Sequence, residues 1–103
     1  MGFSEYTKIL KDIEVAVKLL HSEDIVFADL RDTNILVTRD ENNEYHGILV
    51  DFDWAGMNNK DKYPDFMNHD EIVWPIGAQA GMPLKKEHDI HWLNVWKNLY
   101  LIG

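Results

Sequence analysis

The sequence contains no cysteine, few basic residues and no long apolar run. The absence of Cys among its 103 residues excludes disulfide bonds and thiolate metal sites. Ten Lys and Arg against 18 Asp and Glu give a formal net charge of −8, which argues against a nucleic-acid partner, because phosphates require a basic face. No apolar run approaches membrane-spanning length, and the start "MGFSEYTKIL" lacks a signal-peptide pattern. We therefore expect a cytoplasmic protein that binds neither nucleic acid nor membrane.

The composition that remains is typical of a folded domain. A hydrophobic fraction of 46% and an aromatic fraction of 12%, with four Trp, are too high for a disordered chain. This length allows a single modest core, so we predict one domain over residues 1–103. Residues 55–84 contain all three prolines and three of the six glycines, which predicts an extended irregular segment. A segment of that length without regular structure is usually functional in so small a domain.

Two segments have the apolar periodicity of helices. Residues 4–21 repeat apolar side chains at steps of three and four, with Ser4 as the predicted N-cap. Residues 86–103 are apolar around so much of the circumference that neighbours are expected on several sides. The apolar positions of this second helix are Ile90, Trp92, Leu93, Val95, Trp96, Leu99, Tyr100 and Ile102.

The region between the helices has the character of strands. Residues 25–28 form a short apolar run, and residues 35–39 and 46–52 are the β-branched arms of a predicted hairpin. Residues 40–44, "DENNE", are its polar turn. We therefore expect an α+β fold in which a helix is followed by a small hairpin sheet, an irregular segment and a buried C-terminal helix.

Polar side chains gather at two turns of this region. Asp29, Asp32 and Asn34 lie in "IVFADLRDTNILV", residues 25–37, while Asp51 and Asp53 follow the second hairpin arm. If these strand ends converge, an Asp there can accept a proton, and Asn and Asp oxygens suit a hard cation such as Mg²⁺. Asp and Asn are also the ordinary residues of turns, and spacing alone favours that simpler interpretation.

The motifs themselves resemble a known superfamily. "FADLRDTNILV" followed by "GILVDFDWAG" resembles the core of the protein kinases, whose catalytic loop is H-R-D-L-x-x-x-N and whose metal-binding turn is D-F-G. "YPDFMN", "WPIGAQAGMP" and "EHDIHWL" resemble fungal kinase-like proteins. The resemblance covers nearly the whole chain and corresponds to the middle of a kinase. It implies a truncated carboxy-terminal lobe.

The resemblance also implies roles for individual residues. Asp29 stands where the family has its catalytic base, and Asn34 and Asp51 stand where it binds Mg²⁺ under the phosphates of ATP. Asp53 replaces the glycine of the turn, and because related small-molecule kinases carry an acid there, we include it in the predicted metal set. Asp89 corresponds to an Asp that hydrogen-bonds the backbone of the catalytic loop. These assignments would make the chain a Mg-ATP-dependent phosphotransferase.

Departures from the family pattern favour a different outcome. Phe27 and Ala28 replace the His and Arg of the catalytic loop. The chain contains no G-x-G-x-x-G motif, and no strand with a phosphate-pairing Lys precedes residue 25. We therefore expect weak ATP binding at best and favour a catalytically silent, pseudokinase-like binding module. Because full-length kinases cover the last helix and the top of the sheet, we also expect self-association or a protein partner at those two surfaces.

Three other interpretations compete with the kinase resemblance. "DFD" at residues 51–53 could be a D-x-D metal site of the glycosyltransferase kind, with both carboxylates on one side of a strand. His88, Asp89 and His91 could contribute to a zinc site on a helix. Trp92 and Trp96, one turn apart, could stack on a ligand but are more often core residues.

Overall fold

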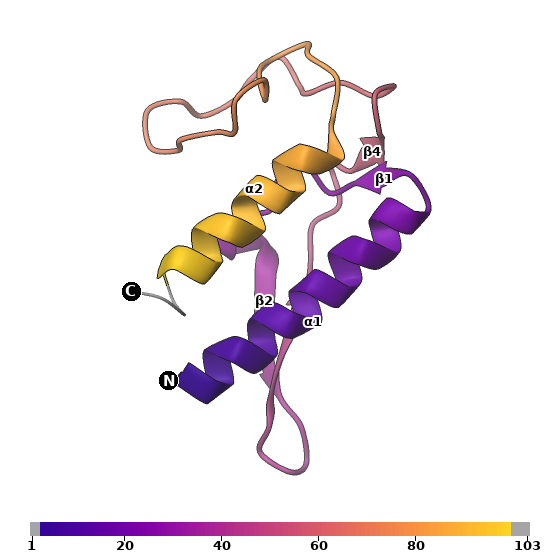
Figure 1. Ribbon diagram of the computed structural model, residues 1–103. Helices are drawn as coiled ribbons and strands as arrows, with labels where there is room; N and C mark the ends of the chain where they lie inside the picture. Colours follow the sequence, from indigo (N-terminus) through magenta and orange to yellow (C-terminus); the bar gives the residue numbers. More distant parts are fainter. Residues whose placement is uncertain (1–2, 100–103) are drawn as a thin grey trace.

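Two helices pack against two small antiparallel sheets in the computed structural model, which describes residues 3–99 (Figure 1). Helix α1 (Phe3–Ser22) leads into strand β1 (Ile25–Val26), which pairs with β4 (Gly56–Met57). A 3₁₀ turn, η1 (Asp32–Asn34), precedes the hairpin of β2 (Ile35–Arg39) and β3 (Tyr45–Leu49), and α2 (Lys86–Lys97) follows a long irregular segment. The expected α+β class is therefore confirmed.

Helix α1 is amphipathic, as its periodicity predicts. Leu10, Ile13 and Val17 point into the core, and the latter two are completely buried. Burying one such side chain is worth about 1.5–3 kcal/mol, which explains why the helix forms against the sheet. Ser4 already lies inside the helix, so its predicted role as N-cap is wrong.

The hairpin has the predicted first arm and a shorter second arm. Strand β3 ends at Leu49 because Asp51 adopts the left-handed conformation (φ 64°), which turns the chain out of the ladder. Helix α1 crosses one face of the hairpin, and Gly47 lies at the crossing, where a side chain would be crowded. A Cβ on Gly47 would lie 3.0 Å from the Ile9 side chain and from its carbonyl oxygen. Figure 1 shows the turn of the hairpin projecting beyond α1.

The segment between β4 and α2 is irregular, as predicted, but it is anchored. Tyr63, Ala78 and Leu84 are buried in a small cluster with Val26 and Ala28. The two-residue strand β4 was not predicted, since a Gly-Met pair carries no strand signal by itself.

Helix α2 is covered on one side only. Its buried side chains are His88, Asp89, Trp92, Leu93 and Trp96, and the last three join α1 in the main core. Ile90 and Leu99 are 43% and 62% exposed, so neighbours bury only part of the apolar circumference, and apolar surface stays exposed at this helix as expected for a chain without the covering elements of a full-length kinase. The predicted apolar positions Tyr100 and Ile102 lie outside the described residues.

The dimensions agree with this incomplete cover. The radius of gyration is 14.1 Å, and the principal extents are 43 × 29 × 19 Å. A compact domain of about 100 residues has a radius near 13 Å. The molecule is thus thin, and much apolar surface stays in contact with solvent. Among residues 3–99, no helix has the length and apolar character needed to cross a bilayer.

Candidate functional site

The polar loop after β1 is fixed to α2 by one buried carboxylate. Asp89 has no exposed surface, and its Oδ2 and Oδ1 accept the backbone N–H groups of Phe27 (2.8 Å) and Ala28 (2.9 Å). His21, near the end of α1, places its Nε2 2.9 Å from the same Oδ2. Ala28 holds an unfavourable left-handed conformation (φ 76°), which these bonds offset. The predicted hydrogen bonding between Asp89 and the loop backbone is confirmed.

The next acid of the loop is already paired. Arg31 donates from Nε to Oδ1 of Asp29 over 2.5 Å and from its terminal nitrogen to Oδ2 over 3.2 Å, so both carboxylate oxygens bind one guanidinium. This hydrogen-bonded pairing raises the pKa of Arg31 above its usual range. The guanidinium also lies 5.7 Å from the centre of the Trp74 ring, a cation–π contact that helps to hold it in place.

Asn34 ties the loop to the end of β3. Its side-chain N–H donates to the backbone oxygen of Asp29 over 2.7 Å, and its backbone carbonyl oxygen accepts the N–H of Val50 over 2.9 Å. The residue before Asp51 is therefore bonded directly to Asn34. The structure thus brings the 29–34 loop and the 51–53 turn together at the base of the hairpin.

The 51–53 turn is open to solvent. Asp51 and Asp53 are exposed, and the N–H of Asp53 donates to Oδ1 of Asp51 over 3.3 Å. Phe52 packs edge-on against Phe27, with ring centres 5.0 Å apart. Residues 51–53 lie outside β3, so the expected D-x-D arrangement on a regular strand is wrong.

Three carboxylates lie close enough to the Arg31 guanidinium to raise its pKa. After the hydrogen bond with Asp29, the charges of Asp29, Asp32 and Asp51 each add to the upward shift of the Arg31 pKa. Oxygen atoms of Asn34 and Asp51 are ligands that a hard cation such as Mg²⁺ prefers, so the chemistry of this donor set fits the ion. Arg31 partly neutralises the same acids and therefore competes with a metal for them.

The predicted zinc set on α2 is not supported by the geometry. His88 is buried, and its Nδ1 lies 2.7 Å from the Tyr63 hydroxyl, while both Asp89 oxygens hold the loop backbone. Burial lowers the pKa of His88 and raises that of Tyr63, so both groups are neutral and the Tyr63 hydroxyl donates a hydrogen bond to Nδ1 of the imidazole. His91 is exposed and does not join them.

The tryptophans of α2 are core residues. Trp92 meets Trp74 edge-on at 5.9 Å, and both Trp92 and Trp96 belong to the main core cluster. The simpler interpretation of this pair is confirmed.

One polar cluster was missed by the sequence reasoning. Asp40, Glu44 and His46, at the hairpin turn, bring ligand atoms within 4.8 Å of one another. His46 is already shared between two acids, with Nδ1 3.2 Å from Asp12 and Nε2 2.8 Å from Asp40. The turn "DENNE" followed by "YH" was the available signal, since a tight hairpin brings both arms side by side.

Comparison with known proteins gives a partial similarity. No family model matches the chain. Over 53 residues the chain is 42% identical to a protein of Dictyostelium discoideum named "Probable serine/threonine-protein kinase kinY". The matched stretch is 52% of this chain and 9% of that kinase, so the chain corresponds to less than a tenth of its relative. This similarity supports a protein-kinase-like relationship and no narrower assignment.

Proposed function

We propose that this chain is a kinase-like domain that works as a catalytically silent binding module. The observation that carries the proposal is the ion pair of Asp29 with Arg31, which engages both oxygens of the carboxylate that the kinase resemblance makes the base. A general base must accept a proton from the substrate. Proton uptake by Asp29 would weaken two charge-assisted hydrogen bonds, which opposes that role.

Exposed apolar side chains support the binding role. Phe66, Val73 and Ile76 are 90%, 86% and 99% exposed on the irregular segment. Leu36 and Ile48 face each other across the hairpin and are about half exposed, and Leu99 extends from α2. Apolar surface of this kind usually marks an interaction site. A protein partner or a second copy at the last helix and at the hairpin remains the proposed occupant of these surfaces.

The alternative function is Mg-ATP-dependent phosphoryl transfer. Asp29 would act as base, and Asn34 and Asp51, with Asp53 beside them, would hold Mg²⁺. The hydrogen bond between Asn34 and Val50 favours this candidate, because it brings the two predicted ligands to neighbouring turns. When bound, the metal would neutralise phosphate charge.

A titration with Mg-ATP separates the two candidates. The proposal expects no heat of binding and no thermal shift in the wild type at millimolar nucleotide. The alternative expects a shift that Asp51→Asn abolishes. The matched control is Asp24→Asn, because Asp24 is also exposed and has nearly the same backbone conformation (φ 63°).

Arg31→Ala tests the ion pair directly. If the pair silences the site, removal of the guanidinium frees Asp29, and Mg-ATP then gives a thermal shift that the wild type lacks. A wild-type response that disappears in Asp51→Asn, but not in Asp24→Asn, would overturn the silent-module proposal.

A further inference from the structure

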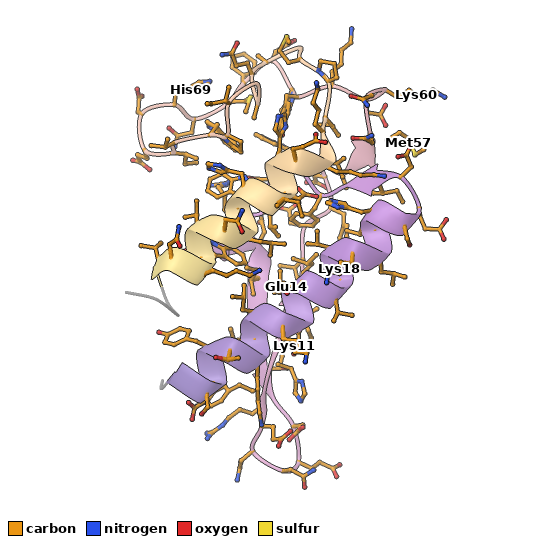
Figure 2. The ribbon with its side chains drawn as sticks, in the orientation of Figure 1. Lys11, Glu14, Lys18, Met57, Lys60 and His69 are labelled. Carbon is orange, nitrogen blue, oxygen red and sulfur yellow. The ribbon has the colours of Figure 1, made fainter. Side chains whose placement is uncertain are left out.

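A groove runs between α2 and residues 71–73 of the irregular segment. Its volume is about 500 Å³, and we call it the α2 groove. Val95, Trp96 and Leu99 form its helical side, and Ile72 and Val73 face them. Val73 and Leu99 are 86% and 62% exposed, so solvent reaches the apolar walls. Figure 2 shows His69, from the same segment, on the part of the chain that extends beside α2.

Two rows of side chains from α2 and from Leu99, just after its end, line this groove, and the Trp92–Trp96 row is largely buried in the core. Trp92 and Trp96 are four residues apart, as are Val95 and Leu99, and all four line the groove. Rows of side chains spaced by four residues are the ridges between which a second helix places its own side chains. Helix α2 spans 12 residues, a length of about 18 Å at 1.5 Å per residue. A partner helix of about three turns would therefore match the length of α2.

The charge around the groove is acidic. Asp32 and Glu71 line it, and the cation there, Arg31, is already bound by Asp29. Residues 65–73 carry Asp65, Asp70 and Glu71 and contain no Lys or Arg. The whole chain has a formal net charge of −8. A partner with basic residues beside its apolar face would complement this rim.

A buried donor beside the groove has no partner. The indole Nε1 of Trp92 is shielded from solvent and makes no hydrogen bond to any residue that the structure describes. Trp92 is 9% exposed and lines the α2 groove. Buried N–H groups without an acceptor are rare in native proteins. This unpaired donor belongs to a residue that lines the α2 groove.

We propose that the α2 groove is the docking site for a basic amphipathic helix of another protein. The inference rests on the proposed function, because it names the partner class of the binding module. Apolar residues of the partner would enter between the two rows of α2 and cover Val73. Its Lys or Arg side chains would face Glu71 and Asp32. A second copy of this chain fits less well, because two chains of net charge −8 repel each other.

The test uses two synthetic peptides of about 16 residues with Leu at identical helix-period positions. One carries Lys at its polar positions and the other Glu. Binding to the full chain is measured by fluorescence anisotropy at low and at physiological salt. We expect the Lys peptide to bind more tightly than the Glu peptide by at least about tenfold, with weaker binding as salt rises.

Two groove variants and two matched controls locate the site. Val73→Ser is expected to weaken the Lys peptide about fivefold, and Glu71→Gln about threefold with a smaller dependence on salt. Val15→Ser removes a side chain that is 60% exposed on α1, and Glu41→Gln removes an exposed acid of the hairpin turn. Both controls should bind within about twofold of the wild type.

Nuclear magnetic resonance gives a second readout. The indole N–H signal of Trp92 should shift on addition of the Lys peptide, together with the amides of residues 71–73. Light scattering of the free chain at the same concentrations shows whether copies associate instead.

Each remaining outcome overturns the docking proposal. If both peptides bind equally well, charge does not select the partner. If Val15→Ser weakens binding of the Lys peptide as much as Val73→Ser does, the α2 groove is not the binding site. If the free chain forms a dimer and the NMR signals of residues 71–73 shift on dimerisation, the groove is occupied by a second copy of the chain. Failure of the Lys peptide to bind removes this docking site alone, since the Mg-ATP titration decides the proposed function separately.

Discussion

Asp89→Asn is the change that tests most directly how the candidate site is built. Asp89 is completely buried and accepts the N–H groups of Phe27 and Ala28 with its two oxygens. Asn keeps the shape but offers one acceptor and one donor, so one backbone N–H then faces another N–H. The loop that holds Asp29 would lose half of its anchor.

The expected cost follows from the contacts. A hydrogen bond to a charged group contributes about 1.5–3 kcal/mol, and a buried donor left without an acceptor costs about 1–3 kcal/mol. We therefore expect a loss of about 3–5 kcal/mol in the free energy of unfolding, in line with other broken buried charge pairs. Since domains of this size are stable by about 5–15 kcal/mol, the change removes about a fifth of the total or more.

Urea unfolding followed by tryptophan fluorescence measures this loss. With a slope of about 2 kcal/mol per molar urea, the midpoint should fall by about 2 M. Glu87→Gln is the matched control, because Glu87 lies in the same first turn of α2 but is exposed. Both changes lose the favourable interaction with the helix dipole, about 0.3–1 kcal/mol, and only Asp89→Asn loses the buried bonds. A midpoint shift no larger than that of the control would refute the reasoning.

Amide hydrogen exchange keeps the test open if the variant folds poorly. The N–H groups of Phe27 and Ala28 should be protected in the wild type, because both are buried and bonded to Asp89. Rapid exchange of these two amides in the wild type would contradict the anchor itself.

Three further predictions concern packing and pH. Gly47→Ala should destabilise the fold by about 1–3 kcal/mol in urea unfolding, because the new Cβ would lie 3.0 Å from the Ile9 carbonyl oxygen and side chain; an unchanged midpoint would contradict the close approach of α1. Tyr63→Phe should cost about 1–3 kcal/mol by the same assay, since it leaves Nδ1 of the buried His88 without its donor; a stable variant would exclude this anchor. The contributions of His46 and His88 to stability should change with pH in opposite directions. Each contribution is measured as the difference between the wild type and the variant with Gln at that position. Hydrogen bonding to the hairpin acid raises the pKa of His46 above 6.5, so its contribution is full below pH 6.5 and fades as pH rises. Burial lowers the pKa of His88, so its contribution is full above pH 6.5 and is lost as pH falls. Melting temperatures between about pH 5 and 8 check both signs, and parallel slopes would refute them.

The helices and the first hairpin arm follow from local patterns. The three- and four-residue spacing of Leu10, Ile13 and Val17 predicts one buried helical face, and that face is buried. Residues 35–39 form a strand as their β-branched composition predicts. Ser4 shows the limit of such reasoning, because a capping residue is also tolerated inside the first turn.

The candidate site was predictable only in outline. The motif match placed Asp29, Asn34 and Asp51 at neighbouring turns, and the bond between Asn34 and Val50 agrees with that placement. The Arg31 pairing was not foreseen, since a guanidinium two residues away can equally point to solvent. Whether the site binds Mg²⁺ or ATP stays a prediction for the titration.

Sequence by itself determined the α+β fold class, because apolar periodicity and strand composition are local in the chain. Only the tertiary structure decided which groups meet. Asp89 reaches the backbone of Phe27 and Ala28 across 62 and 61 residues of chain, a contact that no local pattern fixes. The half-covered α2 has the same origin, since burial depends on which elements pack against a helix and not on its own apolar content.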